Sequence, residues 1–220
     1  MKGLLIKDLK LMMMQKNFFI LILLITMGMM FFSDDVIFPL GFLSFVVSLF
    51  AISTISYDDF DNCNAFLFTL PITRRIYVKE KYSLGLILGC LAWCLAMLLA
   101  FIAKSIKPEF PMPLADLFLL ALAILPMVFV ILSIMLPFHL KFGSESGRLA
   151  LIVAFALIAL IGIGINEGMK WIFNFDILQW LNSLQSLEFG TVVIIEFIIS
   201  LIILVISLNI SQLIMQKKEF

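Results

Sequence analysis

The sequence has few charged residues for its length. They make up 14% of its 220 residues, and hydrophobic residues make up 63%, whereas a soluble domain has roughly 25% charged and 45–50% apolar residues. This composition excludes a water-soluble fold and also a disordered chain, which needs low hydrophobicity and high net charge. The 15 basic and 15 acidic residues cancel, so no overall positive field favours nucleic acid as a partner. A membrane protein with several helical spans remains.

Motifs of common enzyme classes are also missing. No Gly-x-x-x-x-Gly-Lys-Ser/Thr phosphate-binding loop occurs, so we expect the chain to hydrolyse no ATP by itself. His139 is the only histidine, which excludes a His-Glu-x-x-His zinc site and weakens any His-based triad. Cys63, Cys90 and Cys94 have no histidine at a metal-ligand spacing. We therefore predict that this chain is not an enzyme and binds no metal or cofactor.

Six apolar stretches are long enough, or nearly so, to cross a bilayer. A helix rises 1.5 Å per residue, so about 20 apolar residues cover a hydrocarbon core of ~30 Å. The predicted spans are residues 18–32, 36–56, 83–103, 117–138, 149–165 and 191–214. Because the apolar runs are continuous rather than alternating, a β-barrel is disfavoured. The predicted fold is all-α, a polytopic membrane protein whose single transmembrane domain covers residues 1–220.

The distribution of basic residues predicts the orientation in the membrane. Twelve of the 15 lie in the N-terminal segment, the connections after the second and fourth spans, and the C-terminal tail. Lys104, Lys107 and Lys170 lie on the opposite side. By the positive-inside rule, both termini are predicted to be cytoplasmic.

Residues 57–82 form the longest connection on the predicted cytoplasmic side. It begins with acidic residues, continues through an apolar stretch and ends with basic residues. Phe66 and Leu70 are four positions apart, so one helical turn would present both on one face. Composition leaves two interpretations open. The segment lies on lipid head groups with Arg74 and Arg75 at the phosphates, or it forms a short helix that docks on a soluble partner.

The same connection resembles the signature region of small ABC-2 type permeases. Those proteins commonly show Tyr-Asp-Glu, then a Phe-Leu…Leu-Pro-Ile-Ser-Arg-Lys core, then Lys-Tyr. The corresponding residues here are Tyr57-Asp58-Asp59, Phe66-Leu67…Leu70-Pro71-Ile72-Thr73-Arg74-Arg75 and Lys81-Tyr82. Asp59 stands where Glu is usual and Thr73 where Ser is usual. Residues 1–8 are also similar to the N-terminal segment of that family.

The resemblance implies the transmembrane domain of a type V-like ABC-2 exporter in a bacterial plasma membrane. Two permeases, identical or different, would pair with two separate ATP-binding subunits that carry ATP and Mg²⁺. The segment after the second span would form a coupling helix docked on the ATPase. The coupling residues so implied are Asp58, Asp59, Phe60, Asp61, Phe66, Leu70, Pro71, Arg74 and Arg75.

The cargo implied by the resemblance is less specific. Small permeases of this kind include exporters of amphipathic or antimicrobial peptides, so a peptide cargo is one hypothesis. Two alternative functions from other classes remain: a channel or holin-like pore without an ATPase, and a membrane sensor or scaffold. The pore predicts rings of polar residues along the spans, and the sequence offers only Glu196 with scattered serines and threonines.

Two segments outside the spans are amphipathic. Residues 1–16 predict an interfacial helix, and the resemblance implies a connecting helix on the inner leaflet that abuts the ATPase. Residues 166–190 face outward and carry Trp171, Phe175 and Trp180. These aromatic residues predict a helix in the outer head-group region, either a plain membrane anchor or part of the exit from the transport pathway.

Two features lie inside the spans. Gly85, Gly89, Ala92 and Ala96 follow one another at spacings of three or four, which predicts a close helix contact in lipid, either internal or with a second permease. Glu196 is the one acidic residue within a span. It is a candidate for the transport pathway or a subunit contact, and the alternative is that it snorkels outward.

Overall fold

The computed structural model describes residues 2–32, 35–60, 66–69, 71–106, 113–173 and 189–218, with backbone only for residues 2, 144–151 and 153–173. The described residues are helical or lie in short connections, and none of them is in a β-strand. The helices are α1 (Lys2–Met14), α2 (Lys16–Phe32), α3 (Ile37–Ser48), α4 (Phe50–Asp59), α6 (Arg74–Ile106), α7 (Leu114–Phe173) and α9 (Phe189–Lys217). The predicted all-α fold is confirmed.

Four helical segments are long and apolar enough to cross a membrane: Ile37–Asp59, Arg74–Ile106, Leu114–Gly143 and Phe189–Lys217. A fifth span is possible if α1 and α2, which meet at a bend of 67°, count as one. The 17 residues of α2 rise about 26 Å, slightly less than a ~30 Å hydrocarbon core. The expected span at residues 149–165 falls where side chains are not described and stays a prediction.

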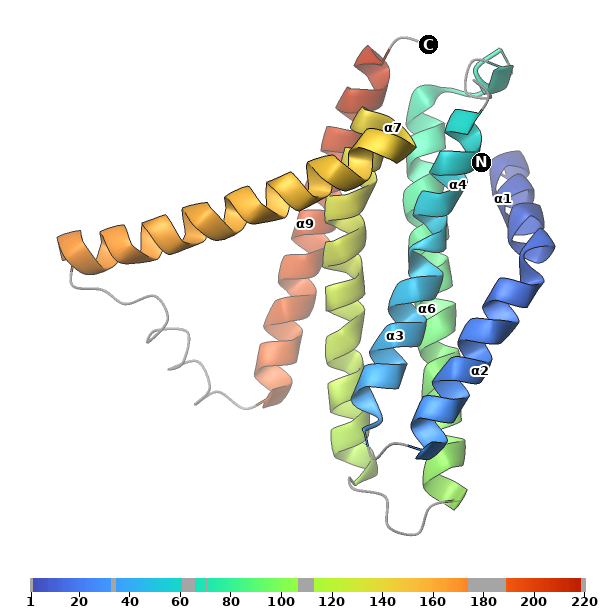
Figure 1. Cartoon of the computed structure of the whole chain (residues 1–220), viewed down its shortest axis with the longest axis vertical. Coiled ribbons are helices and arrows are strands. Elements are labelled where there is room, and N and C mark those ends of the chain that lie inside the picture. The colour runs from blue at the N-terminus through green and yellow to red at the C-terminus, as the bar shows by residue number, and fades with distance from the viewer. Residues whose placement is uncertain are drawn as a thin grey trace.

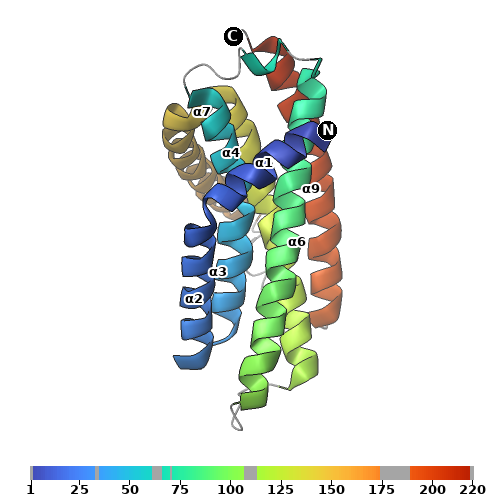
Figure 2. The same ribbon diagram turned by 90° about the vertical axis from the view of Figure 1, so that its right-hand side faces the viewer.

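The long helices stand side by side in a bundle, and both chain termini lie at one end of it (Figures 1 and 2). We call this the terminal end. α6 contacts all the other described helices, and α7 packs along α9. α1 crosses the face of α6 near the terminal end before the chain turns into α2 (Figure 2).

Small residues let α6 approach its neighbours closely. The four small residues singled out above, Gly85, Gly89, Ala92 and Ala96, are all buried. A Cβ atom on Gly85 would lie 3.1 Å from the terminal methyl carbons of Leu132 and 3.3 Å from Cβ of Ala51. A Cβ atom on Gly89 would lie 3.2 Å from Oγ of Ser48. The small-residue stripe therefore packs within the protomer, against α3, α4 and α7.

Hydroxyl groups connect the helices inside the bundle. The Tyr82 hydroxyl on α6 lies 2.5 Å from Ser207 Oγ and 2.8 Å from Ser211 Oγ on α9. Ser207 in turn donates to the backbone carbonyl of Ser133 on α7. A polar group without a partner in hydrocarbon costs several kcal/mol. These contacts therefore satisfy the hydroxyls and tie three helices together.

α7 changes direction at Gly143. This residue has φ of 76° and ψ of −174°, in the region that glycine adopts readily and other residues avoid. Residues 144–173 then continue as a helix in a new direction, away from the bundle (Figure 1). Pro126, where the sequence favours a kink, lies inside the helical stretch before this break.

Candidate functional site

The connection between the second and third expected spans lies at the terminal end. It is shorter than expected, because α4 continues to Asp59 and α6 already begins at Arg74. The α4–α6 connection is therefore residues 60–73. Asp61 and Leu70, two of the implied coupling residues, lie outside the described part of the chain.

Two large aromatic side chains of this connection face outward. Phe60 is 70% exposed and Phe66 is 72% exposed. In the same turn Leu67 is buried, and the ring of Phe68 meets that of Tyr77 edge-on at 5.7 Å. Phe68 thus anchors one side of the turn on α6, while Phe66 is exposed on the other side.

The two ends of the connection are fixed to the C-terminal part of the chain. Arg74 donates from Nη1 to the backbone carbonyls of Gln216 at 2.8 Å and Met215 at 3.2 Å. These carbonyls belong to the last turn of α9, where backbone carbonyls have no hydrogen-bond donor within the helix. At the other end, Asp59 lies 3.8 Å from the Lys218 ammonium. Arg74 is therefore engaged within the protein, whereas Arg75 and Pro71 are exposed.

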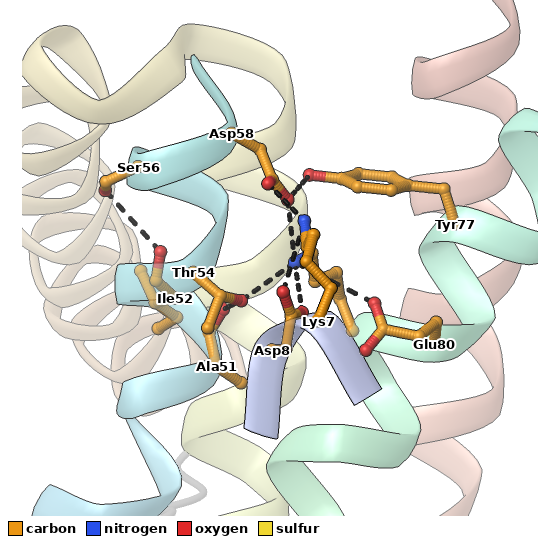
Figure 3. Close-up of polar contacts among 10 residues, drawn as sticks. Lys7, Asp8, Ala51, Ile52, Thr54, Ser56, Asp58, Tyr77 and Glu80 are labelled. Carbon is orange, nitrogen blue, oxygen red and sulfur yellow. Dashed lines mark hydrogen bonds and ion pairs between the residues drawn. The ribbon is translucent and has the colours of Figure 1, made fainter. Parts of the chain in front are cut away.

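A group of seven polar side chains lies where α1, α4 and α6 meet (Figure 3). We call it the charge cluster. Six of its members are buried, and the seventh, Lys7, is half-buried. Its members are Lys7, Asp8, Thr54, Asp58, Tyr77, Glu80 and Lys81.

Lys81 is the centre of the charge cluster. Its ammonium lies 2.5 Å from Oδ2 of Asp8, 2.8 Å from Oδ2 of Asp58 and 3.8 Å from Oε2 of Glu80. It also donates to Oγ1 of Thr54 at 2.9 Å. One fully buried ammonium on α6 therefore contacts α1 through Asp8 and α4 through Asp58 and Thr54.

Lys7 supplies a second ammonium from α1. It bonds to Oδ1 of Asp58 and lies 3.1 Å from Oδ1 of Asp8. Tyr77 donates its hydroxyl to Oδ2 of Asp58 at 3.0 Å, and Figure 3 shows these two side chains pointing toward each other across the space between α4 and α6. Asp58 is thus held by both lysines and one hydroxyl.

The charges of this cluster do not balance if all its groups are ionised. Three carboxyl groups face two ammonium groups, and Oε2 of Glu80 lies 3.8 Å from the Lys81 ammonium, beyond hydrogen-bond distance. Charges are expensive to bury and need partners, so a buried cluster with more carboxyl groups than ammonium groups is a functional candidate. Among the described residues, no three His, Cys, Asp or Glu side chains are arranged so that they could hold one metal ion. The geometry instead suits a mechanical role, joining three helices.

A family model described as ABC-2 family transporter protein matches residues 3–216. The chain belongs to the ABC-2 transporter family. Proteins of this family are membrane components of transporters that work with ATP-binding subunits and are not themselves catalytic. The resemblance seen in the α4–α6 connection is thereby confirmed for nearly the whole chain. No curated protein and no solved structure matches it.

The structure of this ABC-2 protein separates the implied coupling residues into two groups. Phe60, Phe66 and Arg75 are accessible at the surface. Asp58 is only 6% exposed and points into the charge cluster, so in this conformation its carboxylate is not available to a docked partner. Any contribution of Asp58 to coupling would therefore depend on its contacts with the other members of the charge cluster.

Apart from Asp58, no member of the charge cluster is predicted from the sequence to belong to a site. Lys81 and the segment with Lys7 and Asp8 are named there only as part of the family resemblance. Asp8 is an isolated acid in the apolar first segment, and Glu80 and Lys81 immediately precede the expected third span. Charges next to apolar segments are costly to place, which marks these residues as unusual. The sequence does not indicate that Lys7 would meet Asp58, 51 positions away, or that Asp8 would meet Lys81, 73 positions away.

The remaining candidates lie away from the charge cluster. Glu196 is half-buried near the start of α9, toward the opposite end of the bundle, and Ile195 and Ile199 beside it are exposed. Trp171 lies in the second part of α7, where only the backbone is described, and Phe175 and Trp180 lie outside the described residues. Their roles stay predictions.

Proposed function

We propose that the chain is the permease subunit of an ATP-driven ABC-2 exporter in a bacterial plasma membrane, with both termini in the cytoplasm. Two ATP-binding subunits would dock at the terminal end of a permease dimer. The observation that carries this proposal is the pair of exposed aromatic side chains, Phe60 and Phe66, beside the buried charge cluster. Aromatic side chains, phenylalanine among them, are enriched at protein–protein interfaces.

The contacts behind Phe66 supply a path for coupling. Leu67 and Phe68 seat the same turn on Tyr77, and the Tyr77 hydroxyl bonds to Asp58. Asp58 is bonded in turn to Lys7 on α1. Movement of a docked turn would therefore displace α6, α4 and α1 together, because close-packed contacts transmit small shifts rather than absorbing them.

An amphipathic peptide is the proposed cargo. α9 has a long apolar face with many exposed isoleucine, leucine and valine side chains. A peptide with one apolar side could reach this face from the bilayer. Glu196 sits on that helix and is the proposed polar contact.

The test of docking is purification of the tagged full-length chain from its native host with its ATPase. The Phe66→Asp variant should enter the membrane normally and lose the ATPase, because a carboxylate cannot occupy an apolar docking pocket without a large desolvation cost. Phe66→Leu should retain it. Phe32→Asp places the same charge on a side chain that is 94% exposed at the other end of the bundle, and should also retain it. Equal recovery of the ATPase with Phe66→Asp would refute docking through this turn.

A further inference from the structure

A cavity of about 420 Å³ lies between α9 and the part of α7 before the break at Gly143, at the terminal end of the bundle. Its size falls within the range of roughly 300–1,000 Å³ typical of small-molecule sites. Of the lining residues that the structure describes, three are lysines and three are aliphatic. The residues are Lys141, Ile210, Leu213, Ile214, Lys217 and Lys218. We call it the basic cavity.

The lysines are available to an anion to different degrees. Lys218 is partly committed, since it donates to the Leu140 carbonyl at 3.2 Å and lies 3.8 Å from Asp59. Lys141 and Lys217 are exposed, and in the described part of the chain neither has a carboxylate within ion-pair distance. None of the described lining residues is acidic. The described lining therefore concentrates positive charge, and the Asp59 carboxylate near Lys218 neutralises part of it.

The order of the lining residues along α9 adds a second property. Ile210 precedes Lys217 by seven residues, which is about 10 Å along a helix axis. The aliphatic side chains thus lie deeper in the bundle, and the ammonium groups lie nearer its end. A ligand that matches both parts has an anionic head at the membrane surface and an apolar tail directed into the bilayer.

We propose that the basic cavity binds the phosphate head group of an anionic phospholipid. Basic pockets between transmembrane helices on the cytoplasmic side are suited to such head groups, so this assignment uses the orientation proposed above. The site is separate from the aromatic pair at the docking turn. Its residue Lys218 lies near Asp59, and its residue Lys141 is two positions before the break at Gly143. A bound lipid would therefore connect α7, at the point where it changes direction, to the C-terminal end of α9.

The proposal is tested by titrating the purified full-length chain, in an uncharged detergent, with dioctanoyl phosphatidylglycerol. Dioctanoyl phosphatidylcholine and glycerol 3-phosphate are titrated in parallel, and binding is followed by native mass spectrometry. Wild type should bind the anionic lipid in preference to both comparison ligands. Lys141→Gln/Lys217→Gln should bind it about 30-fold more weakly. Each lysine near an anionic lipid strengthens binding about fivefold, and the two contributions multiply.

The matched control is Lys10→Gln/Lys79→Gln, which removes two exposed lysines from the same end of the bundle and should leave binding unchanged. All four positions are exposed, so these substitutions should not disturb folding. Equal binding of the two lipids by wild type would overturn the proposal. So would undiminished phosphatidylglycerol binding by the Lys141/Lys217 variant, or an equal loss in the control. Glycerol 3-phosphate binding as tightly as the lipid would show a soluble phosphate ester site and would also refute it.

Discussion

Replacing Lys81 with methionine removes the ammonium that joins α1, α4 and α6. Methionine fills a similar volume without a charge. The carboxylates of Asp8 and Asp58, 2.5 and 2.8 Å from the lost ammonium, and Glu80 at 3.8 Å would then share the single ammonium of Lys7. The side chain of Lys81 is fully buried, so water cannot replace it without opening the bundle.

The expected loss of stability is large. Removing one partner of a buried ion pair destabilises a protein by about 3–5 kcal/mol, because the other charge is left uncompensated in a poorly solvated place. Lys79→Met is the matched control. It deletes an exposed lysine two positions earlier on the same helix and should change stability by less than about 0.5 kcal/mol.

The assay is reversible unfolding of the purified chain in mixed dodecyl maltoside and SDS micelles, followed by tryptophan fluorescence. Adding Asp8→Asn to Lys81→Met should cost less than the sum of the two single substitutions, by about 1–3 kcal/mol, because the second removes a charge that the first left unpaired. Should Lys81→Met fail to fold, recovery of folded protein in the double variant would equally show that the loss of Lys81 leaves Asp8 unpaired. A Lys81→Met variant as stable as Lys79→Met would refute the assignment of Lys81 as the centre of the cluster.

Two further substitutions test the packing of α6. Gly85→Ala should destabilise the protein by about 1–3 kcal/mol, because the added methyl would lie 3.1 Å from Leu132. Gly28→Ala meets nothing within 4 Å and should be neutral or stabilising by up to about 1 kcal/mol, so equal effects would contradict close packing. Tyr82→Phe should cost about 1 kcal/mol through its lost contacts with α9. Tyr57→Phe loses a contact with Gln15 at an exposed position and should stay within about 0.5 kcal/mol. Both are measured by the same unfolding assay.

The helices were predictable because apolar length is a local property of the sequence. The stretches at 83–103, 117–138 and 191–214 each fall inside a helix long enough to span, and the stretch at 36–56 starts one residue before the helical segment Ile37–Asp59. Their ends were less predictable. The helix of the third span begins at Arg74 rather than near residue 83, since Tyr77 and Lys81 find polar partners inside the protein and need not lie in a solvated loop.

The charge cluster illustrates what a single sequence leaves undetermined. The sequence shows that Asp8 and Lys81 are unusual charges beside apolar runs. Their pairing depends on the 67° bend between α1 and α2, which brings α1 across α6. That bend and the break at Gly143 are tertiary features. A glycine permits the backbone conformation at the break, but many glycines lie in ordinary helix, so residue type alone does not predict it.

The ATP hydrolysis rate of the permease–ATPase complex in proteoliposomes tests the central claim most directly. If the α4–α6 connection couples the two subunits, the complex with wild-type permease should hydrolyse ATP at a rate that differs from that of the isolated ATPase. The Phe66→Leu complex should behave like wild type. Phe66→Asp, added at the same permease-to-ATPase ratio, should return the rate to that of the isolated ATPase. A rate that is the same with wild type, with Phe66→Asp and without permease would contradict the proposed function.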